Sequence, residues 1–162
     1  MSDGLREADE DNPRGYLEYE PVKNLLRDAS WLGAGRGKAI KIVAPLLSAV
    51  PAGLPCRVIF VERDLEEVLD SQARMIERRR REIEDTRERR ALLKSEYAKT
   101  VARVKAMLAQ RVGTRVLSVG YRDTVSDPGL VAERVNRFLG GGFDVGAMAS
   151  AVDSALHRNK NL

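Results

Sequence analysis

The feature that most constrains the fold is an abrupt change of hydrophobic period at Asp64. Cys56–Val61 is a β-branched and aromatic run of strand length. From Asp64 onward, apolar residues recur at helical spacing, and Asp64 stands where it can cap the first turn of a helix. A strand that leads directly into a helix is typical of α/β proteins, so we expect a parallel sheet flanked by helices.

Further strand and helix patterns alternate along the chain. Ala39–Ala44 and Thr114–Val119 are also short runs of strand type. Helical spacing or helix-opening residues occur in four other segments, which are Glu20–Trp31, Leu46–Leu54, Pro128–Leu139 and Val145–Leu156. The alternation predicts an α/β fold in which a small parallel sheet is covered by helices.

Residues 64–111 are predicted to form a long helix or a helical hairpin. Two apolar stripes, Leu65–Ile76 and Leu92–Leu108, flank the segment Glu77–Arg90, which is nearly all charged. That segment fits a solvated helix, the tip of a hairpin or a mobile excursion. The arginine run Arg78–Arg81 within it offers charge for phosphates, but neighbouring carboxylates neutralise it locally, so we expect a solvated face.

Composition limits the classes of protein to which this chain can belong. With 162 residues and 43% apolar content, we expect one domain over residues 1–162. The net charge of +4 does not identify a class of ligand. A single cysteine, Cys56, and a single histidine, His157, exclude a disulfide framework and the usual zinc clusters, so no metal is expected. The acidic start and the lack of a long apolar run predict a cytoplasmic protein without a transmembrane segment.

The strongest candidate for chemistry is the turn after Val61. In parallel α/β folds, ligands bind beyond the carboxyl ends of the strands. Arg63 lies at that point and offers a guanidinium fork to an anion, and Ser71 follows two helical turns later. The alternative is that Arg63 pairs with a neighbouring carboxylate and that Ser71 is a small packing residue.

Three segments together resemble sulfotransferases that use 3'-phosphoadenosine 5'-phosphosulfate (PAPS), in particular bacterial members. The spacing from Arg63 to Ser71 resembles the strand and helix that hold the 3'-phosphate of the nucleotide in that family. Val119–Pro128 and the later Phe138-Leu139-Gly140 resemble a second family motif, and Asn12–Glu20 resembles a third. The resemblance runs from about Asp3 to Arg158 and implies a P-loop-type fold in which Arg63 and Ser71 bind PAPS.

The sequence departs from the family pattern in two places. The family begins with a strand, a glycine-rich loop and a helix that bind the 5'-phosphosulfate, and this sequence starts after that unit. Gly33–Ala39 is the closest substitute, but it precedes a predicted strand and is expected to be a connection. The position that matches the catalytic histidine, two residues before Pro45, is Val43, which cannot take a proton. Glu18 and Glu20 are the nearest carboxylate alternatives.

These departures favour a sulfotransferase-like fold that has been truncated and has lost the reaction. We expect a non-catalytic binding or structural subunit of a complex, with no cofactor and with another protein chain or a second copy as partner. The alternative is a PAPS-dependent sulfotransferase that transfers a sulfuryl group to a hydroxyl or an amine. Nucleic acid is not expected, because aromatic residues for base stacking are missing from the arginine-rich stretch.

Two reactive side chains stand outside these motifs. His157 lies beside Arg158, Asn159 and Lys160 and is interpreted as solvent-exposed, with an anion contact as the alternative. Cys56 lies in an apolar strand and is expected to pack as a small hydrophobic residue.

Overall fold

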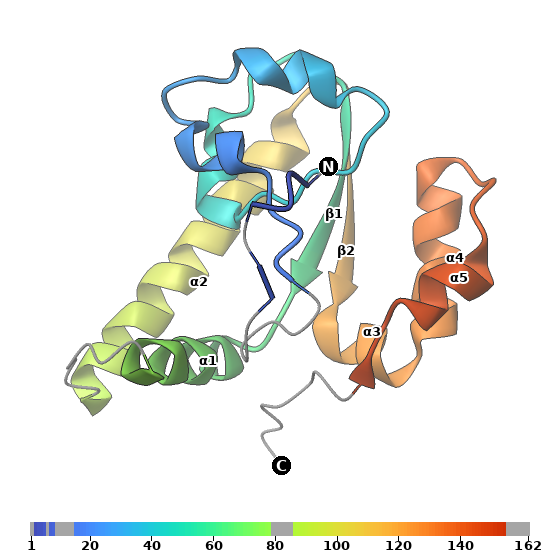
Figure 1. The fold of residues 1–162 in the computed structure, drawn as a ribbon. Helices are drawn as coiled ribbons and strands as arrows, with labels where there is room; N and C mark the ends of the chain where they lie inside the picture. Colours follow the sequence, from blue (N-terminus) through green and yellow to red (C-terminus); the bar gives the residue numbers. More distant parts are fainter. Residues whose placement is uncertain (1, 6, 9–14, 79–85, 155–162) are drawn as a thin grey trace. The chain divides into compact units, whose positions relative to one another are not determined.

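The computed structural model describes residues 2–5, 7–8, 15–78 and 86–154 (Figure 1). They divide into two compact units, each treated separately below. The first unit comprises the described residues up to Leu54 together with Lys99–Val112. The second unit comprises Pro55–Ala98 and the described residues from Gly113 onward.

The sheet of the second unit consists of two parallel strands, β1 (Cys56–Glu62) and β2 (Thr114–Gly120) (Figure 1). Both strands form where the sequence predicts them, and their parallel pairing confirms the α/β class. Ile59 pairs directly with Leu117 in the register. Phe60 and Val119 are the buried residues of the strands. The sheet therefore presents the ends of both strands, at Glu62 and Gly120, side by side.

In the described part of the second unit, one helix begins just after β1 and three follow β2, and three of these helices were predicted. The four helices are α1 (Leu65–Arg78), α3 (Tyr121–Ser126), α4 (Pro128–Leu139) and α5 (Val145–Ser150). The cap at Asp64 is confirmed, because its Oδ1 accepts hydrogen bonds from the backbone N–H groups of Glu66 and Glu67. Helix α3 is an addition to the prediction. Helix α5 ends at Ser150, before the predicted end at Leu156, which lies outside the described residues.

Replacement of Asp127 by alanine is expected to lower the free energy of unfolding by about 1 kcal/mol. Asp127 is the N-cap of α4, and its Oδ1 accepts a hydrogen bond of 2.9 Å from the backbone N–H of Leu130. Urea denaturation followed by circular dichroism measures the loss. Asp127→Asn keeps an acceptor oxygen and is expected to retain most of the stability, so an equal loss in both variants would contradict the capping role.

Helix α2 (Arg87–Gln110) contributes its first half to the second unit and its second half to the first. In the second unit, Arg90 donates hydrogen bonds to Glu66 and Asp70 of α1, at 3.2 and 2.6 Å. Tyr97 Oη donates a hydrogen bond of 2.8 Å to Gln72 Oε1. The described part of residues 64–111 thus contains two helices, α1 and α2, in side-chain contact. Arg79–Arg81 lie outside the described residues.

The first unit contains three short 3-10 helices, η1 (Glu20–Asn24), η2 (Ser30–Gly35) and η3 (Ala44–Ala49). The continuous helix predicted over Glu20–Trp31 is wrong. The chain turns between η1 and η2, and Asp28 Oδ1 accepts a hydrogen bond of 2.9 Å from the backbone N–H of Ser30. This local side-chain bond stabilises the turn in place of a continuing helix.

The strand predicted over Ala39–Ala44 is also wrong. Residues 39–43 are irregular and pair with neither strand of the sheet, and η3 begins at Ala44. Pro45 lies in the first turn of η3, where its fixed φ fits and its missing N–H costs nothing. The short helix predicted within Leu46–Leu54 is confirmed in part by η3. Among the described residues, no helix is both long and apolar enough to cross a membrane.

Candidate functional site

A pocket of about 270 Å³ lies at the carboxyl ends of β1 and β2. It is lined by Glu62, Arg63, Asp64, Gly120, Tyr121 and Arg122. These residues come from the two turns where β1 leads into α1 and β2 leads into α3. Parallel pairing brings the two turns together although nearly sixty residues of sequence separate them. Ligands of α/β folds bind at this place, beyond the carboxyl ends of the strands.

A buried carboxylate, Glu67 of α1, joins the two arginines of this pocket. Its side chain is 0% exposed. Arg63 Nε lies 3.1 Å from one of its oxygens, and Arg122 donates to the other oxygen from Nε at 2.9 Å and from Nη2 at 2.6 Å. Burial raises the pKa of Glu67, but hydrogen bonds from Arg122 and Arg63 outweigh it, so the pKa is lowered from its ordinary value. Glu67 therefore carries a negative charge at neutral pH and holds both arginines.

The ring of Tyr121 fixes the guanidinium of Arg63 from a second side. The guanidinium carbon lies 4.6 Å from the ring centroid, within the range of a cation–π contact. Because Glu67 engages only Nε, the two Nη groups of Arg63 remain as donors, and no described residue accepts a hydrogen bond from them. Arg63 is thus held in one orientation while keeping donors for an anion.

Ser71 does not line this pocket. It is exposed on α1, two helical turns beyond Arg63. The structure instead brings Arg63 together with Glu67, Tyr121 and Arg122. The alternative that Arg63 pairs with a neighbouring carboxylate is confirmed, and the carboxylate is that of Glu67, four residues further along the chain. Sequence reasoning did not single out Glu67 or Arg122 as site residues.

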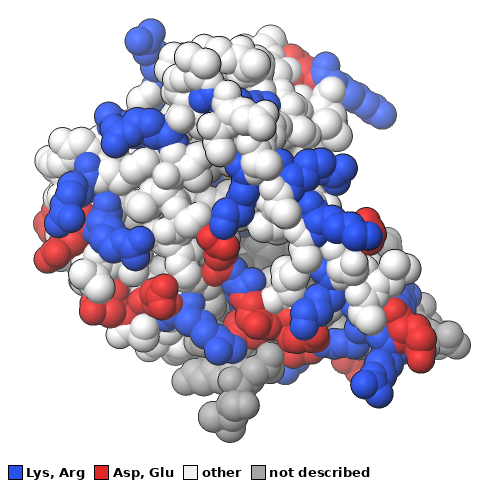
Figure 2. Space-filling model, turned by 180° about the vertical axis from the view of Figure 1, so that it is seen from behind, with Lys and Arg blue, Asp and Glu red and all other residues white. Residues whose placement is uncertain are grey.

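The charges around the pocket limit how strongly it attracts an anion. Two guanidinium groups face three carboxylates, those of Glu62, Asp64 and Glu67. This local balance is negative by one charge, although the chain as a whole is positive by four. Figure 2 shows both basic and acidic side chains on the face that it draws. Any anion at Arg63 is therefore expected to bind weakly.

Three other sequence candidates, Cys56, Glu18 and Glu20, each lie beside a polar partner. Cys56 Sγ lies 3.6 Å from Thr114 Oγ1 of the neighbouring strand. Glu18 lies 3.7 Å from Lys41 Nζ, and Glu20 is paired with Lys23 at 2.7 Å. His157 lies outside the described residues. In the part of the chain that is described, no group of three His, Cys, Asp or Glu side chains is placed to hold a metal ion.

Two further segments are those in which the sequence differs from the sulfotransferase pattern. Gly33–Ala39 forms the end of η2 and the turn after it, which confirms the prediction of a connection. Val43 lies in the irregular segment before η3 and is 56% exposed. Neither segment adjoins the end of a strand among the residues that the structure describes.

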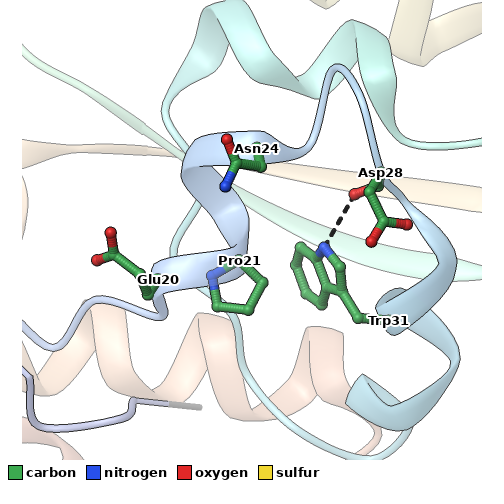
Figure 3. A pocket seen from close by; sticks show the side chains of 5 residues that line it. All are labelled: Glu20, Pro21, Asn24, Asp28 and Trp31. Carbon is green, nitrogen blue, oxygen red and sulfur yellow. Dashed lines mark hydrogen bonds between the residues drawn. The ribbon is translucent and has the colours of Figure 1, made fainter.

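A second pocket, of about 310 Å³, lies in the first unit around Trp31 (Figure 3). Trp31 Nε1 donates a hydrogen bond of 3.1 Å to the carbonyl of Asp28. The two carboxylates of the lining already have partners, since Glu20 pairs with Lys23 and Asp28 accepts from Ser30. This pocket lacks a side chain poised for chemistry, and the pocket at Arg63 is the stronger candidate.

Comparison of the chain with protein-family models, with curated proteins and with solved structures finds no match.

Proposed function

We propose that this chain is a sulfotransferase-like protein that acts as a non-catalytic binding or structural subunit and holds the 3'-phosphate of an adenosine bisphosphate weakly at Arg63. The observation that carries the proposal is the position of Arg63. It leaves the carboxyl end of β1 beside the end of β2, and Glu67 and Tyr121 orient it. A guanidinium held in this way loses little freedom when it binds a phosphate.

The non-catalytic part of the proposal rests on the side chains near the expected chemistry. Val43 occupies the position that matches the family's catalytic histidine and has no group that takes a proton. Glu18 and Glu20, the carboxylate alternatives, each lie beside a lysine. Sulfuryl transfer depends on positioning and on stabilisation of developing charge, and the described residues supply one arginine pair for that work.

The native chain is expected to bind adenosine 3',5'-bisphosphate with a Kd in the high micromolar range or weaker. Arg63→Ala is expected to remove one charge-assisted contact, of about 1.5 to 3 kcal/mol, and so to weaken binding about tenfold or more. Isothermal titration calorimetry measures both constants. Arg74→Ala, at an exposed arginine of α1 that does not line the pocket, is the matched control and should bind like the native chain.

Two further measurements separate the proposal from its alternatives. Ser71→Ala tests the residue that the family resemblance pairs with Arg63. Incubation with labelled PAPS and a panel of phenols, alcohols and amines tests for transfer, and clear turnover would favour the PAPS-dependent sulfotransferase. Submicromolar binding, or binding that is unchanged in Arg63→Ala, would refute the proposed role of Arg63.

A further inference from the structure

Four exposed arginines of the second unit lie on β1, β2 and α4. Arg57 of β1 and Arg115 of β2 are partners in the register and share one face of the sheet. Both reach the end of α4, since Arg57 donates to the carbonyl of Leu139 and the guanidinium of Arg115 lies 5.6 Å from the ring centroid of Phe138. Helix α4 adds Arg134 and Arg137, and we call these four residues the arginine cluster.

The arginine cluster forms no ion pair with a described carboxylate. All four residues are exposed, and none lies within ion-pair distance of a described Asp or Glu. Arg134 Nη2 instead lies 3.5 Å from the carbonyl of Ser118. By contrast, Arg63, Arg90 and Arg122 each pair with a carboxylate. These four arginines therefore carry positive charge that no described ion pair neutralises, and Glu133 of α4 is the acidic residue next to them in the sequence.

Exposed apolar side chains continue from the arginine cluster along β1. Side chains alternate along a strand, so Ile59 and Val61 share the face of Arg57. They are 37% and 56% exposed, although strands of a parallel sheet are usually covered on both faces. Arginines without a described ion pair, beside uncovered β-branched residues, match the composition of protein interfaces, which are enriched in arginine and apolar at the centre.

We propose that the arginine cluster, with Ile59 and Val61, is a docking surface for an acidic protein segment that also carries apolar side chains. Carboxylates match the guanidinium forks, and the apolar side chains of the segment cover Ile59 and Val61. A nucleic acid supplies phosphates but no apolar side chains for these two residues. The ring of Phe138 lies against Arg115 and is therefore not presented for stacking on bases.

The test uses the full chain and a short fluorescein-labelled peptide in which Glu and Val alternate, with binding followed by fluorescence anisotropy at low ionic strength. The native chain is expected to bind this peptide more tightly than one in which Glu and Ser alternate. Arg134→Glu/Arg137→Glu is expected to weaken binding by about tenfold or more. Arg57 and Arg115 are left unchanged because they contact the end of α4. The substitutions are therefore made at Arg134 and Arg137.

The matched control is Arg74→Glu/Arg103→Glu, which makes the same change of net charge at two exposed arginines without a described ion pair. It is expected to bind the peptide nearly as the native chain does. Circular dichroism checks that both variants fold. The proposal is overturned by absence of binding to the native chain, by an equal loss in the control, by equal binding of the Glu/Ser peptide, or by tighter binding of a single-stranded oligonucleotide. None of these outcomes bears on phosphate binding at Arg63.

Discussion

Glu67→Ala is expected to lower the free energy of unfolding of the second unit by about 2 to 3 kcal/mol. The substitution removes a buried carboxylate and leaves Arg63 and Arg122 without their shared partner. The loss is smaller than for a fully buried pair, because the side chain of Arg122 is 55% exposed and can turn to water. Urea denaturation followed by circular dichroism measures it.

The same substitution also removes one of the three carboxylates around the pocket, but we expect the loss of the contact that orients Arg63 to dominate and phosphate binding to weaken. Glu66→Ala is the matched control. Glu66 is the preceding residue, 39% exposed, and it pairs with Arg90 and Lys94 at the surface, so we expect a much smaller loss of stability and unchanged binding. An equal loss of stability in the two variants would contradict the role assigned to Glu67.

The pH dependence of stability provides a second measurement on Glu67. Burial raises its pKa, but the hydrogen bonds from Arg122 and Arg63 lower it below the ordinary value of 4.5. A lowered pKa in the folded state means that the contribution of Glu67 is complete above pH 4.5 and is lost as the pH falls through the lowered pKa. Glu67→Gln is expected to lose less stability over that range than the native chain. If the native chain and Glu67→Gln lose the same stability as the pH falls, the proposed contribution of the Glu67 carboxylate is wrong.

Leu25→Ala is expected to lower the free energy of unfolding of the first unit by about 2 to 4 kcal/mol. Leu25 is 1% exposed and is the largest fully buried apolar side chain among the described residues. Truncation leaves a cavity that its neighbours fill only in part. Trp31, the single tryptophan of the chain, lies in the same unit and reports its unfolding by fluorescence.

The neighbouring residue supplies a control of the same chemistry. Leu26 is 70% exposed, so Leu26→Ala is expected to change the free energy of unfolding by no more than about 0.5 kcal/mol. Both substitutions remove the same atoms from the turn after η1, and they differ in burial. Similar effects of the two variants would show that the first unit is not packed around Leu25.

The elements predicted correctly are those whose signals are local. The strand Cys56–Val61 and the capped helix after Asp64 follow from β-branched residues, helical spacing and a short side chain at the N-cap, and each signal acts within a few residues. The same holds for α4, where Asp127 and Pro128 mark the start and Gly140, at a φ of 104°, marks the end.

The errors arose where two local signals competed. Ala39–Ala44 has the β-branched residues of a strand, but a strand also needs a partner for its backbone groups, and Pro45 opens a 3-10 helix immediately afterwards. Glu20–Trp31 has helical spacing, but Asp28 and Ser30 form a turn within it. Apolar spacing alone does not show which of two neighbouring leucines, Leu25 or Leu26, is buried.

The sequence by itself determined that Arg63 leaves a strand at the point where a helix begins. Only the tertiary structure decided the neighbours of that side chain. Parallel pairing of β1 with β2 brings Tyr121 and Arg122 to Arg63 across nearly sixty residues of sequence, and Glu67 joins the two arginines while Ser71 stays at the surface. The physical reason is that ion pairs and cation–π contacts depend on distance in space, which strand register sets and local spacing does not.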